Sequence, residues 1–221
     1  MKIDQMFGQQ PIIITLDIDA LLFDKIERAA EAGYSVIEIN GIDAFMLERV
    51  LTEFSQLKIG VGNVINPQQL DDSHQAGAHF VTSPGLLPAL VQTAQVYSIN
   101  YIPGVATLSE AMQALSLQCH YVRPFPASLS MCSVLSKYLP QLRLLPAEVE
   151  LDEAEHFIAT FHVVICAIKN LFNNHSTFWI CCTFNSLNDR KRPLLVSSLL
   201  SIKLINSSPV IPSGFEAQFL H

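Results

Sequence analysis

Short apolar segments alternate with amphipathic segments along the first 170 residues of this chain. The apolar segments are rich in β-branched residues, which is typical of strands that are buried on both faces. They cover residues 11–16, 35–40, 58–64, 79–84, 100–105, 120–125, 141–145 and 162–168. Strands that alternate with helices predict a parallel sheet covered by helices. Eight such units predict an α/β fold of the (β/α)8 barrel type, with irregular last units and any active site at the carboxyl ends of the strands.

Helix boundary signals separate the predicted strands. Asp19 is expected to cap a helix that ends at Gly33. The pair Asn66–Pro67 supplies an N-cap and a first-turn proline, and Thr107 with Glu110 has the spacing of a capping box. Further helices are predicted over residues 42–54, 86–96 and 151–159. These signals support the same alternating architecture.

The alternation ends near residue 171. The remaining sequence is rich in Ser, Asn and Leu and has no sustained period of a strand or a helix. Of the nine glycines only Gly214 follows Gly104, whereas the last loops of such a barrel usually require glycine. We therefore expect a barrel domain over 1–170 and a divergent C-terminal extension over 171–221. The extension is interpreted as a helix at 193–204, as loosely packed chain, or as the product of a shifted reading frame.

Composition limits the classes of function. A net charge of −7 argues against a nucleic-acid surface, which needs clustered Lys and Arg. Residues 1–10 lack the apolar core of a secretory signal, and no apolar run approaches the roughly 20 residues of a membrane span. The five cysteines form neither a CxxC pair nor a metal-binding spacing, which predicts reduced thiols. We expect a cytoplasmic protein without membrane contact, metal or cofactor.

Two charged residues within predicted strands are the candidate catalytic groups. Glu38 lies between two isoleucines, where burial raises the pKa of a carboxyl group toward a range useful for proton transfer. The alternative for Glu38 is a water-bound polar group in the barrel mouth. Arg123 lies in the last predicted strand before a Phe-Pro-Ala turn. It is either an anion-binding residue or the partner of Glu38 in a buried ion pair.

Several segments, taken in order, resemble the 2-keto-3-deoxy-6-phosphogluconate (KDPG) aldolase family. The matching residues are 36–39, 59–70, 76–80, 83–85, 102–104 and 123–127. The resemblance covers somewhat more than half of the chain. It implies a homotrimeric class I aldolase without a metal, which cleaves a 2-keto-3-deoxy sugar acid to pyruvate and an aldehyde. The small-molecule partner that it implies is a 2-oxoacid.

The same resemblance implies roles for individual residues. Glu38 corresponds to the glutamate that moves protons, and Arg123 stands where the family has its Schiff-base lysine. The substrate-binding residues that it implies are Asn63, Pro84, Gly85 and Phe125. A guanidinium stays protonated and has no lone pair with which to attack a carbonyl carbon. Arg123 therefore predicts that aldolase activity is lost or much reduced.

Other positions also depart from the family pattern. Ile42 occupies the place of an arginine that binds the pyruvate carboxylate. Residues 146–150 replace a glycine pair that contacts phosphate, and Glu148 and Glu150 would repel a dianion. Lys169, just after the last strand, is a conceivable substitute nucleophile. Two hypotheses follow: an aldolase of reduced activity, or a non-catalytic barrel that binds an oxoacid or serves as an oligomeric scaffold.

Overall fold

The computed structural model describes residues 3–7, 12–41, 43–160 and 166–168. All of them belong to one compact unit, Met1–Asn185. The predicted extension over 171–221 and its candidate helix lie outside the described residues. The proposed boundary near residue 170 therefore stays a prediction.

The described strands form two parallel sheets. Their bounds are β1 Ile12–Asp17, β2 Val36–Asn40, β3 Lys58–Gly62, β4 Phe80–Thr82, β5 Asn100–Ile102, β6 Gly104–Val105, β7 Tyr121–Pro124, β8 Arg143–Leu144 and β9 Cys166–Ile168. One sheet has the order β5-β4-β3-β2-β1-β9, and the other has the order β6-β7-β8. Every strand pair is parallel, which confirms the predicted α/β class.

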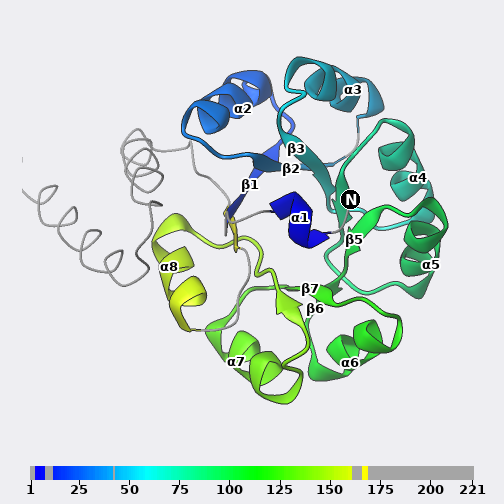
Figure 1. The fold of residues 1–221 in the computed structure, drawn as a ribbon, viewed down its shortest axis with the longest axis vertical. Helices are drawn as coiled ribbons and strands as arrows, with labels where there is room; N and C mark the ends of the chain where they lie inside the picture. The colour runs from blue at the N-terminus through cyan, green and yellow to red at the C-terminus, as the bar shows by residue number, and fades with distance from the viewer. Residues whose placement is uncertain (1–2, 8–11, 42, 161–165, 169–221) are drawn as a thin grey trace, which may run out of the picture. The chain divides into compact units, whose positions relative to one another are not determined.

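The two sheets approach each other at both edges. The strand predicted over 100–105 is divided by Pro103 into β5 and β6, because proline has no N–H to donate. The Pro103 carbonyl accepts from the Arg123 N–H at 2.8 Å, so Arg123 of β7 lies beside this break. At the other edge an isolated parallel bridge joins Val149 to Ile168 of β9. Figure 1 accordingly shows the strands curled around a centre that contains helix α1.

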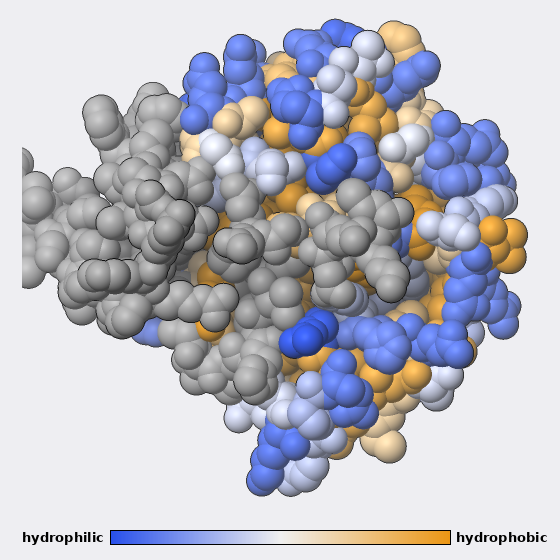
Figure 2. Space-filling view, in the orientation of Figure 1, coloured by the Kyte–Doolittle hydropathy of each residue, from blue (hydrophilic) through white to orange (hydrophobic). Residues whose placement is uncertain are grey.

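Helices α2 to α8 form the outer layer, whereas α1 lies in the centre (Figure 1). Their bounds are α1 Ile3–Phe7, α2 Leu22–Glu31, α3 Ala44–Glu53, α4 Pro67–Gln75, α5 Pro88–Tyr97, α6 Leu108–Ser116, α7 Leu129–Tyr138 and α8 Leu151–Thr160. Figure 2 shows hydrophilic residues over much of the outer surface of this layer, with hydrophobic residues mainly between the helices. Amphipathic helices that bury one face against a sheet produce this distribution.

The helix boundaries test the sequence signals directly. The Asn66 side chain accepts from Gln69 N–H, and Thr107 with Glu110 forms the complete capping box, so both predictions are confirmed. The prediction for Asp19 is wrong. The residue at the cap of α2 is Leu21, and the Asp19 carboxylate accepts from the Leu21 N–H in the preceding turn. Helices α1 and α7 were not predicted.

The alternation of side chains along each strand divides the core in two. Outward residues such as Ile14, Ile37 and Val81 belong to the larger apolar cluster, which packs beneath the helices. Inward residues form the second cluster, together with two side chains of α1. Its buried members are Met6, Phe7, Ile13, Val36, Phe80, Ile102, Tyr121, Leu145, Ala147 and Ala167. The inner space is therefore apolar beside α1 and becomes polar toward the carboxyl ends of the strands.

Candidate active site

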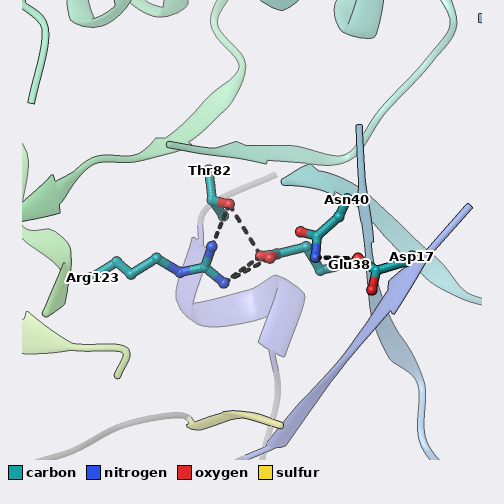
Figure 3. A network of polar contacts seen from close by, with 5 residues as sticks. All are labelled: Asp17, Glu38, Asn40, Thr82 and Arg123. Carbon is teal, nitrogen blue, oxygen red and sulfur yellow. Dashed lines mark hydrogen bonds and ion pairs between the residues drawn. The ribbon is translucent and has the colours of Figure 1, made fainter. Parts of the chain in front are cut away.

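Three polar side chains from different strands meet in the interior. Glu38 comes from β2, Thr82 from β4 and Arg123 from β7 (Figure 3). Each lies two residues after a member of the inner apolar cluster, so strand alternation directs all three inward. Glu38 and Thr82 are fully buried, and Arg123 is 4% exposed. We call these three residues the Arg123 network.

The Arg123 guanidinium links the other two side chains. Its NH2 nitrogen lies 2.7 Å from Glu38 Oε1 and 2.8 Å from Glu38 Oε2. Its NH1 nitrogen donates to Thr82 Oγ1 at 2.8 Å. Thr82 Oγ1 in turn donates to Glu38 Oε2 at 3.2 Å. The single hydroxyl of Thr82 therefore accepts from the cation and donates to the anion, which fixes both partners.

The ion pair between Glu38 and Arg123 is one of the two roles that the sequence left open for Arg123. Its hydrogen bonds are short and charge-assisted, which makes them stronger than bonds between neutral groups. Both charges have also lost their hydration, so their attraction mainly offsets a desolvation cost. The pair consequently holds the two side chains in place more than it stabilises the fold.

Two buried polar atoms next to the Arg123 network lack a hydrogen-bond partner among the described residues. They are Nε of Arg123 and Oγ1 of Thr15, whose residue is 6% exposed. Thr15 is paired with Glu38 in the register of β1 and β2, so both side chains point into the same interior. Buried polar groups in native proteins nearly always have a partner, which is another protein group or an ordered water. An oxygen-bearing molecule would supply that partner.

The absence of a side chain at Gly62 leaves room for the Glu38 carboxylate. A Cβ atom at Gly62 would lie 2.6 Å from Asn40 Oδ1 and 2.7 Å from Glu38 Oε1. The Asn40 amide donates to Asp17 Oδ1 at 2.9 Å, and Figure 3 shows this pair beside Glu38. Any side chain at position 62 would displace these groups. Gly62 is thus a structural requirement of the site.

The turn after β4 is held by buried hydroxyl groups. Ser83 Oγ donates to the Gly85 carbonyl at 2.6 Å, and Tyr101 OH lies 2.6 Å from the same Ser83 oxygen. Since the one proton of Ser83 is committed to Gly85, Tyr101 is the donor to Ser83. Burial raises the pKa of Tyr101, which keeps this proton in place. The turn begins directly after Thr82 and therefore supports the Arg123 network.

The four substrate-binding residues implied by the family resemblance occupy different surroundings. Asn63 follows β3, is exposed and has a φ of 60°, a left-handed conformation that asparagine tolerates. Pro84 and Gly85 are half-buried in the turn after β4. Phe125 is half-buried and packs against the inner apolar cluster. None of the four is bonded to Arg123 in the contacts of the described residues, and their roles stay predictions.

The positions at which the sequence departs from the family pattern are only partly described. Ile42 and Lys169 lie outside the described residues. Lys58 begins β3, at the end of that strand opposite to Asn63. In the segment 146–150, Glu148 and Glu150 are exposed, and Val149 is buried in the bridge to β9. An exposed pair of carboxylates fits the expectation that this segment does not attract a phosphate dianion.

Among the described residues, no group of three or more His, Cys, Asp or Glu side chains is arranged to hold a metal ion. In those residues, likewise, no helix combines the length and the hydrophobicity that crossing a bilayer requires.

A family model described as "KDPG and KHG aldolase" matches residues 3–177. The chain belongs to this aldolase family. It is 29% identical over 162 residues to the 2-dehydro-3-deoxy-phosphogluconate aldolase of Pseudomonas aeruginosa, which covers 69% of this chain and 73% of that protein. It is 35% identical over 122 residues to the KHG/KDPG aldolase of Escherichia coli K12, which covers 50% of this chain and 56% of that protein. The match thus spans little more than half of the E. coli relative.

Solved structures lead to the same family. The KDPG aldolase of Legionella pneumophila, with pyruvate captured as a covalent carbinolamine intermediate, matches with a TM-score of 0.75 and 26% identity. That match covers 83% of this chain and 98% of the Legionella chain. A KDPG aldolase of Zymomonas mobilis, at 22% identity and a TM-score of 0.74, shows the likeness in fold alone. The resemblance stated from the sequence is therefore confirmed.

Sequence reasoning missed Thr15 and Thr82. A single threonine in a strand is ordinary, because β-branched residues are favoured there, so neither position carried a signal of its own. The available signal was register. Once Glu38 and Arg123 are assigned to the interior, the inward positions of neighbouring strands are the places to look for polar partners.

Proposed function

We propose that this chain is a KDPG-aldolase-family protein that binds a small 2-oxoacid without forming a Schiff base. Retro-aldol cleavage of a 2-keto-3-deoxy sugar acid is then lost or much reduced. The observation that carries the proposal is the placement of Arg123, whose guanidinium lies between Glu38 and Thr82 in the interior. This permanent cation can hold a carboxylate or a carbonyl oxygen, but it cannot attack a carbonyl carbon.

We further infer that the two sheets complete an eight-stranded (β/α)8 barrel, with β5 and β6 counted as one strand broken at Pro103. The bridge from Val149 to Ile168 and the hydrogen bond from Arg123 N–H to the Pro103 carbonyl support this closure. In a barrel of this kind the carboxyl ends of the strands form the active-site face. Ligand contacts by Asn63, Pro84, Gly85 and Phe125 at that face belong to the same proposal.

The atoms without partners favour binding over a purely structural role. Arg123 Nε and Thr15 Oγ1 are buried beside Glu38, and within the described ranges no protein group accepts from them, so they can donate to a ligand oxygen. The competing proposal is an oligomeric scaffold, and a homotrimer is the assembly expected from the sequence. Light scattering on the purified chain measures its oligomeric state. Titration calorimetry with pyruvate measures binding, and heat from wild type that disappears in Arg123→Met supports the oxoacid site.

Borohydride trapping tests the absence of Schiff-base chemistry. Wild type incubated with pyruvate and borohydride should show no mass increase. Arg123→Lys places an amine near Glu38 and should yield a pyruvate adduct at position 123. The matched control is Arg143→Lys, which makes the same exchange at an exposed site on neighbouring β8 and should stay unmodified. An adduct on any lysine of wild type, including Lys58 or Lys169, would contradict the proposal.

A further inference from the structure

We propose that the interior around Glu38 catalyses reversible enolisation of a small 2-oxoacid, with no covalent bond between protein and substrate. Glu38 is the base, and Arg123 Nε–H with the Thr15 hydroxyl binds the oxygen that becomes negative. The proposal rests on the non-covalent 2-oxoacid binding inferred above and adds a reaction to it. It concerns proton transfer at carbon, which requires neither an amine nucleophile nor a metal.

The first support comes from the hydrogen bonds of the Arg123 guanidinium, which leave its Nε–H available. A bidentate fork between arginine and carboxylate uses two nitrogens, whereas here NH2 alone contacts both oxygens of Glu38. NH1 is committed to Thr82, and Nε is buried without a partner in the described part of the chain. One N–H of a permanent cation thus remains available to a substrate oxygen.

The second support is Thr15. Its hydroxyl is buried and has no partner in the part of the chain that the structure describes, and its backbone is paired with that of Glu38 across β1 and β2. Ile13 and Val36, two residues earlier on the same strands, both belong to the inner cluster, so Thr15 and Glu38 share one interior face. Strands β1 and β2 therefore bring the Thr15 hydroxyl and the Glu38 carboxylate side by side. Strand β7 supplies Arg123, the counterion of Glu38, together with its Nε–H.

The third support is the remaining capacity of the carboxylate. An ionised carboxylate accepts about four hydrogen bonds. Among the described residues, Oε1 of Glu38 has the single partner Arg123 NH2, whereas Oε2 also accepts from Thr82. Oε1 consequently retains a lone pair for a proton. A carboxylate oxygen with an open acceptor position next to preorganised donors is the arrangement that proton abstraction beside a carbonyl group requires.

The proposed step moves one proton and one electron pair. The C3–H bond of the 2-oxoacid breaks, and its proton passes to Glu38 Oε1. The electron pair forms a C2–C3 double bond, and the former carbonyl π pair moves to oxygen, giving an enolate that accepts from Arg123 Nε–H and the Thr15 hydroxyl. Return of a proton from Glu38 to C3 regenerates the substrate. Nothing is oxidised or reduced, and no second reactant is consumed.

Hydrogen–deuterium exchange measures this reaction. Pyruvate is the probe, and loss of its methyl signal is followed by proton NMR in D2O with the full-length protein. Wild type should exchange the methyl protons faster than buffer alone. Thr15→Val should lower the protein-dependent rate by on the order of 100-fold, as loss of an oxyanion donor does. The matched control, Thr52→Val on the exposed side of α3, should exchange at the wild-type rate.

The variants are chosen so that a folding failure does not hide the answer. Glu38→Gln should also reduce exchange by on the order of 100-fold, but it leaves Arg123 without a counterion. Thr15→Val retains every bond of the Arg123 network and is compared at equal folded concentration by circular dichroism. Exchange by wild type at the buffer rate, or exchange unchanged by Thr15→Val, overturns the inference.

Borohydride trapping in parallel separates this inference from the proposed function. Exchange without a trapped adduct supports both. Pyruvate binding with neither exchange nor adduct overturns the enolisation and leaves the proposed function standing. Exchange that is accompanied by an adduct on a lysine overturns both, because an iminium then supplies the electron sink.

Discussion

The ring of Phe80 on β4 lies directly against the backbone of Gly60 on β3, in a position that a methyl group at residue 60 would overlap. Phe80 is fully buried in the inner cluster, and its ring is also in edge contact with Phe7 of α1 at a centroid distance of 5.7 Å. The ring is thus held between the Gly60 backbone and the Phe7 ring. The sheet therefore depends on a residue without a side chain at this point.

Gly60→Ala should lower the free energy of unfolding by about 1–3 kcal/mol, because it overpacks this core. Urea denaturation followed by circular dichroism measures the change. Gly85→Ala is the matched control, since a Cβ atom there would meet nothing within 4 Å. Equal stability of the two variants would show that the Phe80 ring yields at no cost.

Removing one member of the buried ion pair should cost more than removing both. Arg123→Met leaves the Glu38 carboxylate buried without a counterion, and we expect a loss of about 3–5 kcal/mol in unfolding free energy. The double variant Arg123→Met/Glu38→Leu leaves no unpaired charge and should recover most of that loss. A double-mutant cycle by urea denaturation gives the coupling. Additive losses would contradict the pairing.

Substitution by valine should change the unfolding free energy differently at two threonines of the same interior face. Thr82→Val removes the acceptor of Arg123 NH1 and a donor to Glu38, and it should cost about 1–3 kcal/mol in unfolding free energy. Thr15→Val removes a buried hydroxyl that has no partner in residues 12–41, 43–160 or the other described ranges, and it should cost little or raise stability slightly. Thermal and urea unfolding of the pair compares them. A large loss at Thr15 would reveal a protein contact at that hydroxyl.

Stability should fall with acid through His79. Burial and the nearby Lys58 lower the pKa of His79, while its Nδ1 contacts the backbone of Ile59. The folded state thus favours the neutral ring, and the unfolded chain takes up a proton at about pH 6.5. The contribution of His79 is fully present above that pH and decreases as the pH falls toward the lower folded-state pKa.

Urea denaturation between pH 7.5 and pH 5 checks this prediction. His79→Gln should show a smaller loss of stability over that interval than wild type. His120→Gln, at an exposed position, is the control and should follow the wild-type curve. An unchanged pH dependence in His79→Gln would exclude a role for this ring.

The sequence predicted the elements whose signals are local. Runs of β-branched residues marked the strands, and the cap formed by Asn66 with the box formed by Thr107 and Glu110 marked two helix starts. Helix α7 escaped notice because its apolar face is small, with only Cys132 and Leu135 buried, although Ser128 is an N-cap that could have indicated it. Asp19 was misplaced because an aspartate stabilises a turn as readily as a helix end.

The sequence predicted only the charged residues of the candidate site, because a charge in an apolar strand is easily recognised. Glu38 among isoleucines and Arg123 in an apolar strand stand out, and their pairing was one of the stated alternatives. Thr15 and Thr82 became visible only with the strand pairing, which sets Thr15 beside Glu38, and with the hydrogen bonds that join Thr82 and Arg123 to Glu38. Register arises from long-range packing, and no local pattern encodes it.

Helix α1 limits the route by which a small molecule can reach the interior. Met6 and Phe7 fill the space near the amino ends of the strands with apolar side chains, and the Asn100 amide lies 3.9 Å from Met6 Sδ. These side chains therefore close the interior at the amino ends of the described strands. We expect a molecule that binds at Glu38 to enter and to leave past the loops at the carboxyl ends of the strands.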